Sequence, residues 1–222
     1  MSGVNACKRT GVRRVIKRAI NTRSLDAAIG CVEPGAEIFL LNKGQFSLSD
    51  VLLFLLDQVG PSKVYLATWT AAGADLAHTK ALLDSGMITG MQWMLDSSFP
   101  QRQPAYFRQL RELFSDENVC VVKTHCKFAV IEAECGRRLA LRTSANLNLN
   151  KRIESFEISE DEELASYLLD IFAEAKRLRM SVDKPEREIK ELTQAELFGS
   201  VEASDGDVIE TIPLAVGGMS WD

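Results

Sequence analysis

The chain has 222 residues, of which 46% are hydrophobic, and this suits one globular domain of moderate size with flanking segments. No apolar run approaches the roughly 20 residues that span a bilayer. No apolar signal core follows the charged N-terminus, so a membrane span and a secretory signal are not expected. The five cysteines (7, 31, 120, 126 and 135) include no CxxC pair, which argues against a disulfide framework. A cytoplasmic protein is therefore expected.

The net charge of −5 is unevenly distributed along the chain. Residues 1–150 contain 18 Lys and Arg against 13 Asp and Glu, whereas residues 151–222 contain 8 against 18. Basic residues near the N-terminus precede the first acidic one, and they include Arg13, Arg14, Lys17 and Arg18. Such a cluster attracts polyanions, so these four are candidate nucleic-acid contacts. A solvated basic arm without a partner is the alternative interpretation.

Hydrophobic patterns predict regular elements in chain order. A patchy helical period over 10–30 predicts a basic helix. Apolar runs predict strands at 37–41, 63–69, 89–95 and 118–123, and helices are predicted at 47–60, 73–85 and 106–115, with a loop at 97–104. The helix at 47–60 has a capping Ser and ends at Gly60. This alternation of strands and helices predicts an α/β fold, a layered domain with a mixed, mostly parallel sheet flanked by helices.

The pattern changes after residue 123. Extended runs at 125–132 and 139–144 predict a hairpin with a glycine in its turn, followed by a strand at 153–158 and a helix at 160–178. We therefore expect a basic segment (1–29), one domain (30–180) and an acidic C-terminal tail (181–222). The tail contains a predicted charged helix at 184–197 and an apolar stretch at 208–216, which could bind a protein partner, although plain disorder is the simpler expectation.

Polar residues gather around the predicted hairpin. His125 and Lys127 are two apart, so on a strand they would share a face. An imidazole beside an ammonium suits phosphate chemistry, because lysine binds the charge and histidine transfers protons or attacks as a nucleophile. Ser144 and Asn146 follow the next strand with the same spacing and would add neutral donors. Glu154 could orient one ring nitrogen of His125.

The second histidine of the chain serves as a control for this pattern. His78 and Lys80 are also two apart, but they lie in the predicted helix 73–85. Side chains two apart on a helix diverge, because a turn holds 3.6 residues. The spacing alone is therefore uninformative, and the strand setting with the downstream polar pair makes the motif specific.

These residues together resemble the HKD signature of the phospholipase D superfamily. The match consists of His125-x-Lys127, then Glu132, then Thr143-Ser144-Ala145-Asn146, then Glu154. Two positions depart from the usual form: Glu132 stands where the family has Asp, and Thr143 stands where Gly is usual. The resemblance extends loosely over 30–180 and implies a phospholipase D-like layered fold.

The resemblance implies a metal-independent phosphodiesterase without a cofactor. In that family a histidine forms a covalent phosphohistidine, and a histidine from a second motif protonates the leaving group. His125 would then be nucleophile or acid, Lys127 and Asn146 would bind phosphate oxygens, Ser144 would support the pocket and Glu154 would orient His125. One motif in one chain implies a homodimer, since a two-fold axis supplies the second copy.

The basic N-terminal segment favours a nuclease acting on DNA or RNA over other diesterases. Two alternatives remain open: a phosphodiesterase or transferase for lipid headgroups, and a nucleic-acid-binding or interaction module with weak catalysis. A zinc site at Cys120, His125, Cys126 and Cys135 is disfavoured, because neighbouring strand residues point to opposite faces. The acidic tail could also fold over the basic surface and compete with nucleic acid.

Overall fold

The structure, a computed structural model, describes residues 13–19, 24–148 and 152–181, and the side chains within 24–148 and 152–177. The predicted helix at 184–197, the apolar stretch at 208–216 and the proposed competition by the tail lie outside the described residues. The side chains of Arg13, Arg14, Lys17 and Arg18 also lie outside them. The nucleic-acid contacts assigned to these four residues therefore stay predictions.

The described residues form one eight-stranded sheet in the order β1-β2-β8-β7-β6-β3-β4-β5. The strands are β1 (Arg13–Ala19), β2 (Ala36–Asn42), β3 (Ser62–Thr68), β4 (Ile88–Asp96), β5 (Val119–Val122), β6 (Phe128–Ala133), β7 (Arg138–Thr143) and β8 (Glu154–Ser159). The predicted strands from residue 37 onward are therefore confirmed, with one exception at the start of β6. That strand begins at Phe128, so His125 and Lys127 precede it instead of lying on it.

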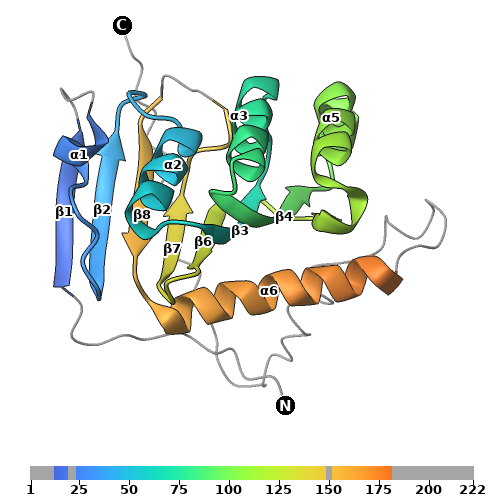
Figure 1. Ribbon diagram of the computed structural model, residues 1–222. Coiled ribbons are helices and arrows are strands. Elements are labelled where there is room, and N and C mark those ends of the chain that lie inside the picture. The colour runs from blue at the N-terminus through green and yellow to red at the C-terminus, as the bar shows by residue number, and fades with distance from the viewer. Residues whose placement is uncertain (1–12, 20–23, 149–151, 182–222) are drawn as a thin grey trace, which may run out of the picture.

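Helices cover both faces of the sheet (Figure 1). They are α1 (Leu25–Ala28), α2 (Leu48–Val59), α3 (Gly73–Asp84), α4 (Phe99–Arg102), α5 (Pro104–Phe114) and α6 (Glu162–Ser181), with a 3₁₀ turn, η1, at Asp116–Asn118. The short helix α4 replaces part of the predicted loop, and it carries a proline in its first turn, where no backbone N–H is needed. No helix in the described ranges is long and apolar enough to cross a bilayer.

The sequence predicts the boundaries of α2 because both ends carry local signals. Ser47 accepts a hydrogen bond from the Asp50 backbone at 3.1 Å, and the Asp50 carboxylate accepts one from the Ser47 backbone at 2.8 Å. This reciprocal capping box satisfies backbone donors that the first turn leaves unpaired. At the other end Gly60 takes a φ of +81°, a conformation that glycine adopts without a steric penalty.

The two faces of the sheet bury separate cores. On one face the side chains of β2–β4 pack with α2, α3 and α5, and Trp93, Leu66 and Leu52 are among the buried residues. On the other face α6 alone packs over β3–β7, with Phe172 in edge contact with both Tyr65 and Phe128 at centroid distances of 5.6 Å. Successive residues on each strand thus serve opposite cores, as the period of two requires. The predicted layered α/β fold is confirmed.

The mixed character of the sheet is confirmed, but its mostly parallel character is not. Three of the seven described strand pairings are parallel, namely β1–β2, β3–β4 and β4–β5. The other four, which run from β2 through β8, β7 and β6 to β3, are antiparallel. The antiparallel strands arise because the chain makes a hairpin after β5 instead of another helical crossover. The hairpin turns at Gly136, whose φ is +91°.

The predicted basic helix over 10–30 is wrong for residues 13–19. These residues form β1, which pairs in parallel with β2 from Arg13 opposite Ala36 to Ala19 opposite Asn42. The short helix α1 follows only at Leu25. The exposed edge of β2 supplies a full row of backbone partners, and the β-branched residues Val15 and Ile16 favour a strand, so sheet pairing overrides the weak helical period.

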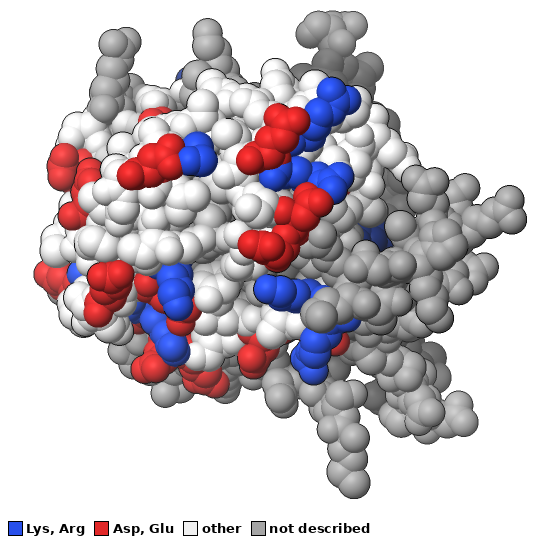
Figure 2. Space-filling view, turned by 45° about the vertical axis from the view of Figure 1, so that its right-hand side comes forward, with Lys and Arg blue, Asp and Glu red and all other residues white. Residues whose placement is uncertain are grey.

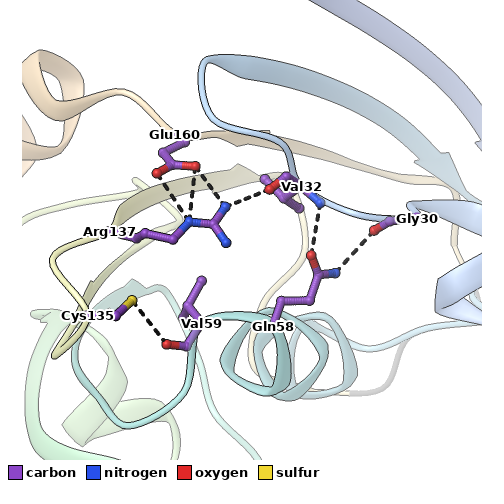
Figure 3. A network of polar contacts seen from close by, with 7 residues as sticks. All are labelled: Gly30, Val32, Gln58, Val59, Cys135, Arg137 and Glu160. Atoms are coloured by element: carbon purple, nitrogen blue, oxygen red, sulfur yellow. Dashed lines mark hydrogen bonds and ion pairs between the residues drawn. The ribbon is translucent and has the colours of Figure 1, made fainter.

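A polar network fastens the hairpin to its neighbours at the edge of the sheet where β3 begins (Figure 3). Arg137 in the hairpin turn binds Glu160 through Nη2 at 2.7 Å and donates to the Val32 carbonyl at 2.6 Å. Gln58 of α2 accepts from the Val32 backbone at 2.9 Å. The hydrogen bond to Glu160 raises the pKa of Arg137, against the opposing effect of burial. The network joins four segments that are distant in sequence.

Charges on the surface are interspersed on the face that Figure 2 shows. Blue and red side chains lie side by side among the described residues, in several places as pairs, so no broad field of one sign covers this face. Among the described residues, Arg111 forms an ion pair with Asp116 and Lys80 with Asp84. Recognition of a polyanion on the face in Figure 2 would therefore depend on a few individually placed cations.

Candidate active site

The predicted site residues come together at the edge of the sheet opposite the hairpin turn. His125 and Lys127 lie in the segment between β5 and β6, Ser144 and Asn146 follow β7, and Glu154 begins β8. The parallel strands β3, β4 and β5 also end at this edge. The two connections β5–β6 and β7–β8 thus meet the carboxyl ends of the parallel half, which is where α/β sheets usually bind ligands.

His125 and Lys127 are neighbours although they precede the strand. Lys127 Nζ lies 3.3 Å from His125 Nδ1 and donates to the His125 carbonyl at 3.1 Å. The Lys127 carbonyl accepts a hydrogen bond from the Thr143 backbone at 3.1 Å, which extends the β6–β7 ladder by one step. This bond fixes the backbone of Lys127, while His125 is exposed to solvent. The pair is therefore accessible and anchored by the sheet.

The contact with Lys127 restricts the state of the imidazole. A protonated amine can only donate, so a hydrogen bond from Nζ requires Nδ1 to be the acceptor. A neutral ring in that contact carries its proton on Nε2, whereas a histidine that acts as an acid carries protons on both ring nitrogens. For Nε2 to attack as a nucleophile, Nδ1 must carry the proton and Lys127 must move to another acceptor. A bound phosphate oxygen would be such an acceptor.

Burial lowers the pKa of the Lys127 ammonium, and the electrostatic attraction of Glu154 opposes the shift. Burial dominates because it removes water from a charged group, whereas the nearby carboxylate stabilises the charge. The effect of Glu154 on this pKa means that its carboxylate is close enough to Lys127 for their charges to interact. A half-buried lysine with a lowered pKa is typical of a binding or catalytic site.

Glu154 and Ser144 are bonded to each other. Ser144 Oγ donates to Glu154 Oε2, and it accepts a hydrogen bond from the Ser155 backbone at 3.0 Å. No hydrogen bond joins Glu154 to His125 within the described residues. The orienting role predicted for Glu154 thus stays a prediction, and its visible contacts fix Ser144 and act on Lys127.

Asn146 offers an amide without a partner. Its Oδ1 is buried and accepts no hydrogen bond, and its side chain makes none elsewhere among the described residues. The segment itself is well fixed, because the Leu147 backbone donates to the Thr70 carbonyl at 3.2 Å and the Ala72 backbone donates to the Leu147 carbonyl at 2.9 Å. Oδ1 can only accept, so a ligand that pairs it must donate, whereas the amide N–H of the same side chain is the group that could donate to a phosphate oxygen.

The two departures from the family motif have structural roles. Thr143 Oγ1 donates to the Ser155 carbonyl at 2.8 Å and accepts from the Ala145 backbone at 2.9 Å, so its hydroxyl braces the turn before Asn146. Glu132 forms an ion pair with Arg138 at 3.1 Å, and Arg138 also reaches Glu162 on α6. Glu132 therefore helps to hold α6 on the sheet and lies outside the site.

His78 behaves as the control predicts. It lies half-buried in α3, and Lys80 forms an ion pair with Asp84 one turn further along the helix. The two side chains thus have separate environments.

No group of three or more His, Cys, Asp or Glu within the described ranges could hold a metal ion.

Three further residues surround His125 that the sequence did not single out. The Trp69 ring lies 5.6 Å from the His125 ring between centroids, tilted by 55°. Asp96 is buried at the end of β4 and accepts a hydrogen bond from the Thr124 backbone at 3.2 Å. Arg102 of α4 stacks on Trp69. Trp69 and Asp96 lie at the carboxyl ends of predicted parallel strands, where ligand-binding residues gather. Their position in the sequence could therefore have identified them as candidate site residues. Arg102 gave none.

A cavity of about 390 Å³ opens beside Lys127, between α6 and the ends of β5–β7. Cys126, Lys127 and Thr143 line it on the sheet side, and Tyr167 and Leu168 line it on the α6 side. It adjoins the phosphate-binding candidates and would leave room for a group attached to a bound phosphate.

Comparisons with known proteins give likenesses of structure alone. No protein-family model and no curated protein matches the chain. A polyphosphate kinase from Porphyromonas gingivalis matches with a TM-score of 0.46 and 13% identity, over 68% of this chain and 26% of the kinase chain. NucT from Helicobacter pylori matches with a TM-score of 0.42 and 16% identity, over 65% of this chain and 97% of NucT. Both likenesses are weak, so the chemistry of this chain is inferred from its own residues.

Proposed function

We propose that this phospholipase D-like chain is a metal-independent phosphodiesterase that cleaves DNA or RNA as a homodimer. The observation that carries the proposal is the contact between His125 and Lys127, 3.3 Å apart, beside Ser144, Glu154 and an unpartnered Asn146. These groups supply a nucleophile or acid, a cation and, in the amide N–H of Asn146, a neutral donor around a space open to solvent. That set suits an anionic phosphodiester, because the cation and donors stabilise the charge that grows on the phosphate oxygens.

The reaction would proceed in two steps. In the first, Nε2 of one His125 forms a bond to phosphorus while the ester bond to the leaving oxygen breaks, and a second histidine gives that oxygen a proton. In the second, water attacks phosphorus, the second histidine takes the proton of the water, and the bond to Nε2 breaks. Lys127 would hold the phosphate oxygens in both steps. Its move from Nδ1 to the phosphate would free His125 to attack.

The second histidine would come from a second copy of the chain. Among the described residues the other histidine, His78, is in α3 and separate from the site. A two-fold axis would bring two copies of His125 together, one protonated on both ring nitrogens as the acid and one with a free Nε2 as the nucleophile. Both states need a proton on Nδ1, so Lys127 would leave Nδ1 in each copy when phosphate binds.

The first test is cleavage of plasmid and single-stranded DNA and of RNA in EDTA, with His125→Ala as the inactive variant. His78→Ala is the matched control, because it changes the same residue type outside the site. Cleavage that survives EDTA and the His78 change but disappears with His125 supports the proposal. Binding without cleavage by the unmodified chain would instead indicate a binding module. Hydrolysis of lipid diesters alone would indicate a headgroup phosphodiesterase.

The homodimer has its own test, based on mixing subunits. Unmodified chain and His125→Ala chain are mixed in varying proportions, allowed to exchange subunits and assayed. If one site needs both histidines, activity per total protein falls as the square of the unmodified fraction, so an equal mixture retains about one quarter. A linear fall, with about one half retained, would contradict a shared site. Sedimentation of the unmodified chain checks the dimer independently.

A further inference from the structure

Arg102 is held rigidly beside the site by three contacts. Its Cζ lies 3.6 Å from the centroid of the Trp69 ring, Nη2 donates to the Trp69 carbonyl at 2.9 Å, and Nε donates to Ser98 Oγ at 2.9 Å. Together they fix both the position and the plane of the guanidinium. Ordering a long arginine side chain costs about 2 kcal/mol of rotamer entropy, so contacts on an exposed residue must offset that cost.

Asp96 links Arg102 to His125. One carboxylate oxygen accepts from the Ser98 backbone at 2.9 Å and from the Ser98 hydroxyl that binds Arg102. The other oxygen accepts from the Thr124 backbone at 3.2 Å, next to His125. The buried Asp96 carboxylate thus joins the α4 region, which carries Arg102, to the segment that carries His125.

The guanidinium charge lies close to the imidazole. Cζ is 3.6 Å from the Trp69 centroid and the His125 centroid is 5.6 Å from it, so the charge is within about 9 Å of the imidazole. Arg102 covers one face of Trp69 and His125 lies against the same ring. The Trp69 ring therefore positions these two side chains and is less available to stack on a nucleic-acid base.

Arg102 makes no direct ion pair within the described residues. Arg111, Arg137, Arg138 and Arg142 each form an ion pair with a carboxylate, whereas the Asp96 carboxylate reaches Arg102 only through the Ser98 hydroxyl. Its Nη1 also has no hydrogen-bond partner among the described residues. A fixed cation with unused donors and no direct carboxylate partner is preorganised for an anion from outside the chain.

We propose that Arg102 binds a phosphate adjacent to the one that His125 attacks, with Trp69 and Ser98 holding its guanidinium in place. The inference rests on the proposed function, since it takes the substrate to be a nucleic-acid strand. Phosphates follow one another every ~3.4 Å of duplex axis on each strand, so a cation within about 9 Å of the attacking imidazole can reach a phosphate next to the scissile one. Lys127 would then hold the reacting phosphate and Arg102 the strand beside it.

The experiment measures binding of a fluorescein-labelled single-stranded oligonucleotide by anisotropy at several salt concentrations. The parent is the full chain carrying His125→Ala, which prevents cleavage during the titration. Arg102→Gln in this parent is expected to weaken binding about tenfold at low salt and to reduce the slope of log affinity against log salt by about 0.7, one phosphate contact on a single strand. Arg102→Lys keeps the charge, so it should retain the slope and lose part of the affinity.

Arg111→Gln is the matched control. It makes the same change at an arginine that Asp116 already neutralises, so affinity and slope should stay at the parent values. A weaker affinity with an unchanged slope in Arg102→Gln would indicate a structural disturbance only and would overturn the assignment of Arg102. Unchanged affinity would overturn it as well. Failure of the parent itself to bind nucleic acid would overturn the proposed function together with this inference.

Discussion

The hairpin network opposite the site predicts a large effect on stability from one substitution, Arg137→Met. The change keeps most of the side-chain length and removes the charge, and with it the contacts of Arg137 to Glu160 at 2.7 Å and to the Val32 carbonyl at 2.6 Å. The two side chains of the pair are exposed by only 26% and 16%, so water replaces these contacts poorly. The substitution therefore weakens the attachment of the hairpin to β2 and β8.

The magnitude follows from the number and kind of contacts. A hydrogen bond to a charged group contributes about 1.5–3 kcal/mol, and two such contacts discounted for partial exposure give about 2–4 kcal/mol. For a domain of this size that loss lowers the melting temperature by about 5–15 °C. Arg137→Lys should recover less than half of the loss, because an ammonium cannot bind both carboxylate oxygens in the planar geometry of a guanidinium.

Urea unfolding followed by circular dichroism measures the effect, with Arg142→Met as the matched control. Arg142 is on the same hairpin and pairs with Glu157 of β8, but these side chains are exposed by 47% and 35%, so its loss should cost under about 1 kcal/mol. Equal costs for the two substitutions, or a cost below about 1 kcal/mol for Arg137→Met, would refute the reasoning from burial.

Three further predictions concern the site, the hairpin turn and the α6 core. Because burial lowers the pKa of Lys127, activity should fall on the alkaline side below the ordinary lysine value of 10.5 as the ammonium loses its proton, and Lys127→Arg should move that fall to higher pH; a pH profile with an unmoved alkaline limb would argue against Lys127 as the titrating group. Gly136→Ala should cost about 1–2 kcal/mol of folding stability through its φ of +91° alone, since an added Cβ meets nothing within 4 Å, and an unchanged denaturation midpoint would contradict this. Phe172→Ala should cost about 3–5 kcal/mol and is checked by the same unfolding assay, because its ring packs on Tyr65 and Phe128; a cost below about 1 kcal/mol would mean that α6 is held mainly by other contacts.

The sequence alone determined the elements whose signals are local. Strand β3 shows as a short apolar run, and α2 shows as a capping serine, an apolar centre and a glycine stop. The composition of the site was readable for the same reason: His125 and Lys127 lie two apart, and Ser144 and Asn146 follow the next strand. These patterns depend on neighbours in the chain, so no tertiary contact was needed to interpret them.

Only the tertiary structure decided features that depend on partners far away in sequence. Residues 13–19 form a strand because the free edge of β2 is beside them, and their weak helical period could not reveal that edge. The antiparallel half of the sheet follows from how β8 inserts between β2 and β7, which no local pattern encodes. At the site, Glu154 bonds to Ser144, and Arg102 reaches His125 only through Trp69 and Asp96. Short-range periodicity predicts which residues are available, whereas packing of distant segments decides which of them meet.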